Sequence, residues 1–225
     1  MRAFKNKSGV ARISGWWCWL LLAALTPTLA GCFGAAAVGM GTTVMLAVDR
    51  RPTETTIADE GIEVRGGNRV REKFGDKAHV NVTSFNRSVL LTGEVPDAAA
   101  RAEAEKLVSG VPNVKSISNE LLVAGVSSFG SRSTDSYITS KVKARFVDAS
   151  QFSTNHVKVV TEGGSVYLLG MVTQREADAA VEVARTTGGV LKVVRLFEII
   201  SEEEARRIDN RATSTGASQA ATKTQ

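Results

Sequence analysis

Cys32 is the residue of this sequence whose neighbours most clearly prepare it for chemistry. It ends the tetrapeptide Leu29-Ala-Gly-Cys32, which follows the apolar run 16–25 and a basic N-terminus made of Arg2, Lys5, Lys7 and Arg12. Small residues at positions 30 and 31 let the backbone enter a peptidase groove, and the thiol can then act as the nucleophile that takes up a diacylglycerol. The pattern predicts a lipoprotein signal peptide over residues 1–31 and acylation at Cys32.

Two other readings of the N-terminal segment stay open. In the first, Cys32 is an ordinary buried cysteine behind a plain secretory signal. In the second, the stretch between Arg12 and Asp49, which contains no charged residue, holds a transmembrane helix. Its second half is rich in Gly, Ala and Thr, which contribute little transfer free energy, so we expect residues 32–58 to be a flexible lipidated tether. Cys18 lies in the segment to be removed, which leaves no partner for a disulfide.

The side chains that enzymes commonly use do not form a catalytic pattern. His79 and His156 occupy equivalent places, and no second histidine, free cysteine or carboxylate pair stands at ligand spacing beside either. Gly163-Gly164 joins two predicted strands and does not lead into a helix, as a phosphate loop would. Ser88 and Ser165 lack the glycines of a nucleophile elbow. We therefore expect no enzymatic activity, no metal, no cofactor and no small-molecule substrate.

The formal net charge of +5 is concentrated at the N-terminus. Four basic residues precede residue 32, which leaves 24 basic and 23 acidic residues for the rest of the chain, a net charge of +1. A balance of this kind does not indicate nucleic-acid binding. The hydrophobic content of 43% is ordinary for a globular protein.

Most of the chain is organised as an internal repeat. The stretch Ser88-Val-Leu-Leu-Thr-Gly-Glu-Val95 returns, 77 residues later, as Ser165-Val-Tyr-Leu-Leu-Gly-Met-Val172. In each copy apolar residues alternate along one face and a glycine follows, Gly93 or Gly170, which predicts a strand that runs out into a turn. Two copies of one small module therefore account for most of the protein.

Each module is predicted to follow the order helix, strand, strand, helix, strand. This order gives an α+β fold with a three-stranded mixed sheet and two helices on one face. A module of about 60 to 70 residues has only a small hydrophobic core and is marginally stable by itself, so we expect the two modules to pack on each other. The predicted segments are a signal peptide (1–31), the tether (32–58), module 1 (59–124), a linker (125–134), module 2 (135–201) and a disordered tail (202–225).

The first helices of the two modules are predicted to differ. In module 1 a helix from Asp59 is weakened by Gly66-Gly67, so we expect it to be short, bent or frayed. In module 2 the matching helix, over 136–147, has no internal glycine. Module 2 should therefore be the more stable of the two. The other helices are expected at 98–108 and 174–186, and the closing strands at 114–123 and 191–200.

The modules resemble the BON domain, found in osmotically induced and nodulation-related envelope proteins. The resemblance rests on the order of four features: an apolar strand that ends in Gly-x-Val, an Ala/Glu-rich helix, the pair Gly-Val, and a last strand. It spans residues 32 to about 201 and is most specific over residues 165–180. Two BON domains behind a lipobox are similar to a group of Gram-negative outer-membrane lipoproteins. The resemblance implies an αββαβ fold for each domain, support of outer-membrane integrity, gathering at division sites and binding of anionic phospholipid by the second domain. Inner-membrane lipoproteins usually carry Asp at the place of Phe33, so the implied location is the periplasmic face of the outer membrane.

By this resemblance the lipid-contacting helix falls on residues 135–147. At 100° per residue one face is apolar and predicts a core stripe of Ile138, Val142 and Phe146. The neighbouring face combines an aromatic ring that can lie at headgroup depth with cations that can meet phosphates. The predicted phospholipid-binding residues on that face are Tyr137, Lys141, Ala144 and Arg145. The family typically has tryptophan at the place of Tyr137, and tryptophan inserts better.

Two functions stay open at this point. The first is a membrane-tethered module that binds anionic phospholipid and maintains the outer membrane. The second is an adaptor that binds a periplasmic protein, such as a cell-wall amidase regulator or the outer-membrane assembly machine. A separate alternative stays open for the helix itself, in which Lys141, Lys143 and Arg145 form only a solvated face and Tyr137 packs at the start of the helix.

Overall fold

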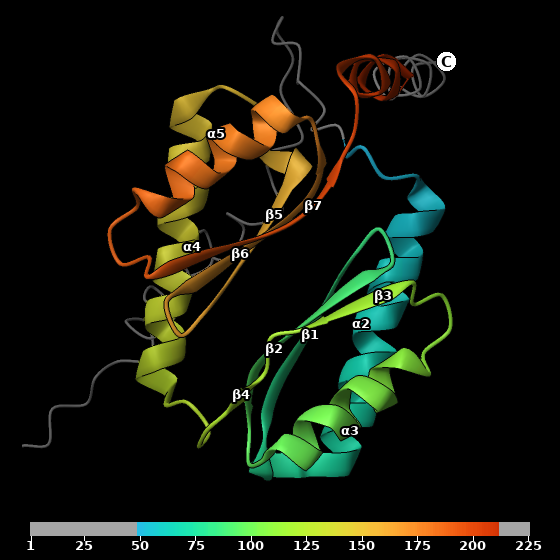
Figure 1. Ribbon diagram of the computed structural model, residues 1–225, viewed down its shortest axis with the longest axis vertical. Coiled ribbons are helices and arrows are strands. Elements are labelled where there is room, and N and C mark those ends of the chain that lie inside the picture. Colours follow the sequence, from blue (N-terminus) through green and yellow to red (C-terminus); the bar gives the residue numbers. More distant parts are fainter. Residues whose placement is uncertain (1–48, 212–225) are drawn as a thin grey trace, which may run out of the picture. The chain divides into compact units, whose positions relative to one another are not determined.

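The computed structural model describes residues 49–211 and contains two modules with the same order of elements (Figure 1). The first module consists of α2 (Thr53–Phe74), η2 (Gly75–Lys77), β1 (His79–Phe85), β2 (Ser88–Val95), α3 (Ala98–Ser109), β3 (Ser116–Asn119) and β4 (Leu122–Val123). The second consists of α4 (Phe129–Ala149), η3 (Thr154–His156), β5 (Val157–Glu162), β6 (Ser165–Val172), α5 (Gln174–Arg185) and β7 (Lys192–Ile199). The predicted α+β fold of two αββαβ modules is confirmed. The signal peptide, Cys32 and residues 32–48 of the tether lie outside the described residues.

Each sheet has the second strand of its hairpin at the centre. β2 pairs antiparallel with β1 and parallel with β3 and β4, and β6 pairs antiparallel with β5 and parallel with β7. The closing strand of module 1, predicted as one strand, is split into β3 and β4. At the break the Leu121 N–H donates to the side chain of Asn119 (3.2 Å), and the Leu121 side chain is buried. The backbone N–H of Leu121 is thus satisfied by a nearby side chain instead of by a neighbouring strand.

Gly93 and Gly170 lie inside β2 and β6, so the prediction that they lead into turns is wrong. The facing strand passes too close for a side chain at either position. A Cβ on Gly93 would lie 2.0 Å from the carbonyl oxygen of His79, and a Cβ on Gly170 would lie 2.3 Å from that of His156. Both glycines are therefore required for the close approach of two strands.

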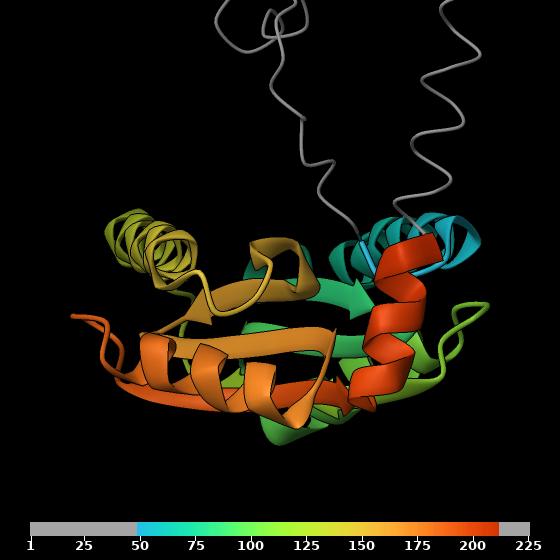
Figure 2. The ribbon, with the colours of Figure 1, turned by 90° about the horizontal axis from the view of Figure 1, so that it is seen from above.

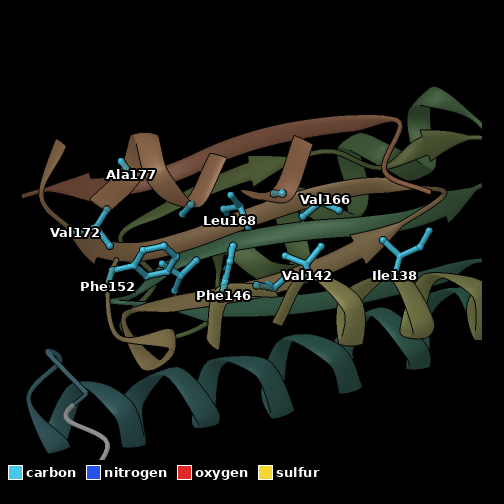
Figure 3. Close-up of a cluster of buried hydrophobic side chains, with 12 residues drawn as sticks. Ile138, Val142, Phe146, Phe152, Val166, Leu168, Val172 and Ala177 are labelled. Carbon is cyan, nitrogen blue, oxygen red and sulfur yellow. The ribbon is translucent and has the colours of Figure 1, made fainter. Parts of the chain in front are cut away.

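The helices of each module cover one face of its sheet, as Figure 1 shows for α4 and α5. In module 2 the predicted stripe of Ile138, Val142 and Phe146 is buried, which confirms it (Figure 3). The apolar residues of α5 that are fully buried there are alanines, and Val181 and Val183 are partly buried against the cluster. Small alanine side chains let α5 approach the sheet closely. The buried cluster consists of Ile138, Val142, Phe146, Phe152, Val157, Val159, Val166, Leu168, Val172, Ala177, Ala180 and Ala184.

The opposite faces of the two central strands are buried as well. Tyr167 and Leu169 of β6 form a cluster with Phe85 of β1 and Leu90 of β2. The two modules belong to one compact unit and share this cluster. The packing of module on module, which the small individual cores led us to expect, supplies the additional apolar burial.

α2 is a continuous helix of 22 residues, so the predicted start at Asp59 and the predicted weakening at Gly66-Gly67 are wrong. A Cβ on Gly66 would come within 3.1 Å of the Val82 side chain, whereas nothing lies within 4 Å of the same atom on Gly67. Gly66 thus lets α2 pack closely on the sheet, and this packing outweighs the helix propensity cost of about 1 kcal/mol per glycine. The expected difference in stability between the modules loses its basis.

Helical structure also extends beyond the other predicted bounds. α4 begins at Phe129, where the Ser128 hydroxyl accepts a hydrogen bond from the Ser131 N–H (3.2 Å), so residues 129–134 of the expected linker are helical. Residues 202–211 form a further helix in which Ala205 is buried, so the expected disorder is wrong for that segment. Figure 2 shows this C-terminal helix (red) beside the start of α2 (blue).

A buried aspartate on the first helix of each module holds the turn of the hairpin. Asp59 accepts hydrogen bonds from the Ser84 hydroxyl (2.6 Å) and from two backbone N–H groups of the β1–β2 turn (2.8 and 2.7 Å). Asp135 accepts two backbone N–H groups of the β5–β6 turn at 3.0 and 2.8 Å. Each helix is therefore fixed to the far end of its hairpin as well as to the sheet.

Candidate lipid-binding surface

The four predicted phospholipid-binding residues lie together on one side of α4. The Tyr137 side chain is 64% exposed and Ala144 is exposed, while Lys141 and Arg145 are half-buried. The Lys141 ammonium nitrogen lies 4.7 Å from the centre of the Tyr137 ring, within the range of a cation–π interaction. An exposed aromatic ring and a cation thus form one unit on the surface, beside the buried stripe.

Lys141 and Arg145 also bind the C-terminal end of α5. Arg145 Nη1 donates to the carbonyl oxygen of Val183 (3.0 Å) and to the Thr187 hydroxyl (2.9 Å), and Lys141 Nζ donates to the carbonyl oxygen of Gly188. Val183 lies in the last turn of α5, where unpaired carbonyls carry partial negative charge that Arg145 offsets, and Gly188 lies in the loop that follows the helix. Lys141 and Arg145 are therefore more than a solvated face, whereas Lys143 is exposed, and Tyr137 is too exposed to be a packing residue.

The loop between α5 and β7 adds an apolar residue that the sequence analysis missed. A Cβ on Gly189 would come within 3.2 Å of the Ile138 side chain, so this loop runs directly against α4. Leu191, two residues later, is 82% exposed, although its backbone N–H donates to the Gly164 carbonyl oxygen (2.9 Å). The available signal was an apolar residue two positions after the pair Gly188-Gly189, directly before the strand begins at Lys192.

The charge of α4 distinguishes it from α2, the equivalent helix of module 1. α4 carries four basic and two acidic residues, a net charge of +2, whereas α2 carries four basic and five acidic residues, a net charge of −1. Both helices expose large apolar side chains, among them Ile57 and Val64 on α2. Of these two helices, α4 is therefore the one that combines exposed apolar groups with a net positive charge.

The expectation that no carboxylates accompany the two histidines is wrong in three dimensions. His79 Nδ1 lies 3.2 Å from Glu94 Oε2 and 3.8 Å from Glu162 Oε1. In module 2, His156 Nδ1 lies 3.5 Å from Glu176 Oε1. These neighbours come from the facing strand, the other module and the start of α5, so spacing along the chain could not reveal them.

Arg50 joins three separate segments of the chain. Its guanidinium donates to both carboxylate oxygens of Glu176 (2.6 and 3.1 Å), to both of Asp209 (2.9 Å each) and to the Met171 carbonyl oxygen (3.1 Å). Burial disfavours the ionised form of Glu176. The His156 imidazole 3.5 Å away, together with hydrogen bonds from Arg50 and the Thr173 N–H, outweighs that effect and holds the pKa of Glu176 well below its ordinary value.

Comparisons with known proteins agree with the fold. The BON domain family matches residues 68–125 and 134–201. The chain is 39% identical over 183 residues to the outer membrane lipoprotein DolP of Haemophilus influenzae, which covers 80% of this chain and 94% of that protein. It is 35% identical to the 21 kDa hemolysin of Actinobacillus pleuropneumoniae (68% of this chain, 80% of the relative) and 34% identical to the osmotically-inducible protein Y of Escherichia coli (51% and 58%). Within residues 49–211, none of the helices is both long and apolar enough to cross a bilayer.

Proposed function

This chain belongs to the BON domain family, and we propose on that basis that it is a lipid-anchored protein of the periplasmic face of the outer membrane. We propose further that its second module binds anionic phospholipid and that the protein supports envelope integrity, including at division sites. The relative aligned over 94% of its length is an outer membrane lipoprotein, which supports the location. The tetrapeptide that ends at Cys32 supports the lipid anchor.

The observation that carries the lipid-binding proposal is the pairing of the exposed Tyr137 ring with the Lys141 ammonium on a helix of net charge +2. A tyrosine ring can lie at the depth of the headgroups while its hydroxyl stays hydrated. Lys141 would then exchange the Gly188 carbonyl for a phosphate oxygen. Leu191 supplies an apolar contact from the adjoining loop, and each cation near an anionic surface contributes about 1 kcal/mol.

Tyr137→Ala and Lys141→Gln are each expected to weaken binding to vesicles that contain phosphatidylglycerol by about fivefold, the equivalent of roughly 1 kcal/mol. The measurement is co-sedimentation of the compact unit, residues 45–225, with anionic and with phosphatidylcholine vesicles. Binding should fall as salt is added and be nearly absent on phosphatidylcholine. Tyr137→Trp should strengthen it. Glutamine is preferred to glutamate at position 141, because a negative charge beside the end of α5 would also destabilise the fold.

Ile57→Ala is the matched control for this test, because Ile57 is an equally exposed apolar residue on the negatively charged helix α2. It should leave vesicle binding unchanged. A folded double variant of Tyr137 and Lys141 that sedimented with anionic vesicles like the parent protein would remove this surface as the site. The adaptor function would then be the better account of the protein.

Cys32→Ala is expected to abolish anchoring. Each buried methylene of an acyl chain contributes about 0.8 kcal/mol, so several chains on one cysteine hold a protein stably, and no other thiol remains after cleavage. Membrane fractionation of cells and the mass of the mature N-terminus give the measurement. A Cys32→Ala protein that was still cleaved and still fractionated with the outer membrane would refute the anchor.

A further inference from the structure

Three ionisable side chains from two modules meet around the start of β1. His79 opens that strand, Glu94 is its cross-strand partner on β2, and Glu162 ends β5. The Nδ1 atom of His79 lies 3.2 Å from a Glu94 oxygen and 3.8 Å from a Glu162 oxygen, and all three ligand atoms lie within 4.8 Å of one another. The side chains are 17, 9 and 6% exposed, so this is an enclosed cluster rather than a surface group of charges.

The two carboxylates of this cluster have little positive charge to offset them. Among residues 49–211, no lysine or arginine nitrogen lies within 4.0 Å of Glu94 or Glu162; the hydrogen bonds come instead from the Asn81 amide (2.9 Å, to Glu162) and the Ser127 N–H (3.2 Å, to Glu94). Burial raises the pKa of Glu162, and the nearby negative charges of Glu94 and Asp135 add to that effect. The cluster therefore holds more negative charge than its surroundings stabilise.

The second module contains a related cluster in which a cation is built in. His156, the repeat equivalent of His79, lies 3.5 Å from a Glu176 oxygen and 3.9 Å from an Asp209 oxygen. There the Arg50 guanidinium binds both carboxylates, at 2.6 and 2.9 Å. Each module thus places its histidine beside two carboxylates. In module 2 the carboxylates lie at different nitrogens of the imidazole and Arg50 binds both, whereas in module 1 both lie at Nδ1 and their nearest positive group is the imidazole.

We propose that His79, Glu94 and Glu162 form a binding site for a divalent first-row transition ion, of which Zn²⁺ fits best. The site offers one imidazole nitrogen and two carboxylate oxygens, a donor set that zinc accepts. Ca²⁺ and Mg²⁺ prefer oxygen ligands throughout, whereas one of the three donors here is an imidazole nitrogen. Ligands about 2.0–2.1 Å from zinc lie roughly 3.3 Å apart. The three atoms lie within 4.8 Å of one another, so the widest pair needs to close by at most about 1.5 Å.

A route to the site is present. Two cavities of about 350 and 560 Å³ share His79, Asn81 and Arg132 in their walls, and Glu162 lines the smaller one. A hydrated ion can therefore reach the cluster, and water can complete its coordination from the cavity side. This site is independent of the α4 surface and of lipid binding.

The test is a ZnCl₂ titration of the full chain, purified in detergent and freed of metal with EDTA, followed by calorimetry and by thermal unfolding. We expect one saturable Zn²⁺ per chain and a rise in the unfolding temperature, with no rise at equal concentrations of CaCl₂ or MgCl₂. His79→Gln and Glu162→Gln should each lower the affinity for Zn²⁺ at least tenfold.

His156→Gln is the matched control, because it changes the same residue type at the equivalent place in the cluster that already contains Arg50; it should leave the Zn²⁺ affinity within twofold. If His79→Gln fails to fold, the Zn²⁺ affinity of Glu162→Gln tests the site instead. Glutamine keeps the size of the side chain and can still accept the hydrogen bond from the Asn81 amide. No saturable binding by the parent chain, or equal affinity in a folded Glu162→Gln variant, would overturn the site.

Discussion

Gly93→Ala is expected to reduce the free energy of unfolding by about 3 to 5 kcal/mol, enough to unfold a module of this size. The added Cβ would lie 2.0 Å from the His79 carbonyl oxygen, a backbone atom that cannot move without opening the β1–β2 ladder. Gly93 also has a φ of +109°, a conformation that strains any other residue. Urea denaturation followed by circular dichroism gives the measurement.

Gly170→Ala separates the two causes, because Gly170 meets the His156 carbonyl oxygen at 2.3 Å and is not among the positive-φ glycines of the described chain. Gly170→Ala should reduce the free energy of unfolding by about 2 to 3 kcal/mol, from overpacking alone. Gly67→Ala is the control: its Cβ would meet nothing within 4 Å, and alanine in a helix should stabilise α2 by about 1 kcal/mol. A loss below 1 kcal/mol for Gly93→Ala would show that the strands can separate cheaply and that the glycine is not needed there.

The position of these glycines illustrates what the sequence could predict. The order of elements, both hairpins and the core stripe of α4 follow from local periodicity and from the repeat, and the structure confirms them. A glycine after an apolar stretch, however, indicates a turn and a close strand contact equally well. The distinction depends on where the facing strand lies, and Gly93 therefore appeared to end a strand whose interior it occupies.

Two errors at helices have the same origin. Helix propensity disfavours Gly66, but the space between α2 and the side chain of Val82 requires a small residue there. The polar composition of residues 202–211 indicated disorder, but Asp209 of that segment is bound by Arg50 and Ala205 is buried. In both cases a tertiary contact outweighs a local preference.

For the candidate surface, the sequence placed the residues on one face of α4 and could not place their partners. Arg145 binds Val183 and Lys141 binds Gly188, contacts that span 38 and 47 residues of the chain. The packing of α4 beside α5 creates these contacts, and no spacing rule for a single helix contains them. How much of the charge of Lys141 or Arg145 is available to a phosphate therefore depends on the groups that each side chain contacts on α5 and the loop after it.

Arg50 is the residue that local reasoning was least able to find, since its partners Glu176 and Asp209 lie 126 and 159 residues away. Its side chain is 3% exposed and its guanidinium makes hydrogen bonds to both carboxylates. Glu176 has a second role, because its side chain also accepts from the Thr173 N–H and completes the capping box of α5. One buried cation thus holds together the start of the described chain, the start of α5 and the C-terminal helix.

Arg50→Ala is expected to lower the free energy of unfolding at pH 7 by about 3 to 5 kcal/mol, because it leaves the Glu176 carboxylate buried without its cation. Protection of the amide hydrogens of residues 202–211 against exchange should fall as well. Arg175→Ala is the matched control: Arg175 also links α5 to the C-terminal helix, through Glu202 at 3.7 Å, but its side chain is 64% exposed. An exposed pair of this kind contributes about 0–1 kcal/mol, so this variant should remain close to the parent protein.

The effect of Arg50→Ala should depend on pH in a definite direction. The pKa of Glu176 is lowered in the folded protein, so the unfolded chain binds more protons whenever the pH lies between the two values, and stability rises with pH across that range. The stabilisation is fully present above the ordinary glutamate pKa of about 4.3 and is lost as the pH falls below it. Because Arg50 supplies part of that stabilisation, the difference between the parent protein and Arg50→Ala should narrow from pH 7 to about pH 3 in urea denaturation. An unchanged difference at the two pH values, with residues 202–211 still protected, would show that Arg50 is not what binds the C-terminal helix to α5.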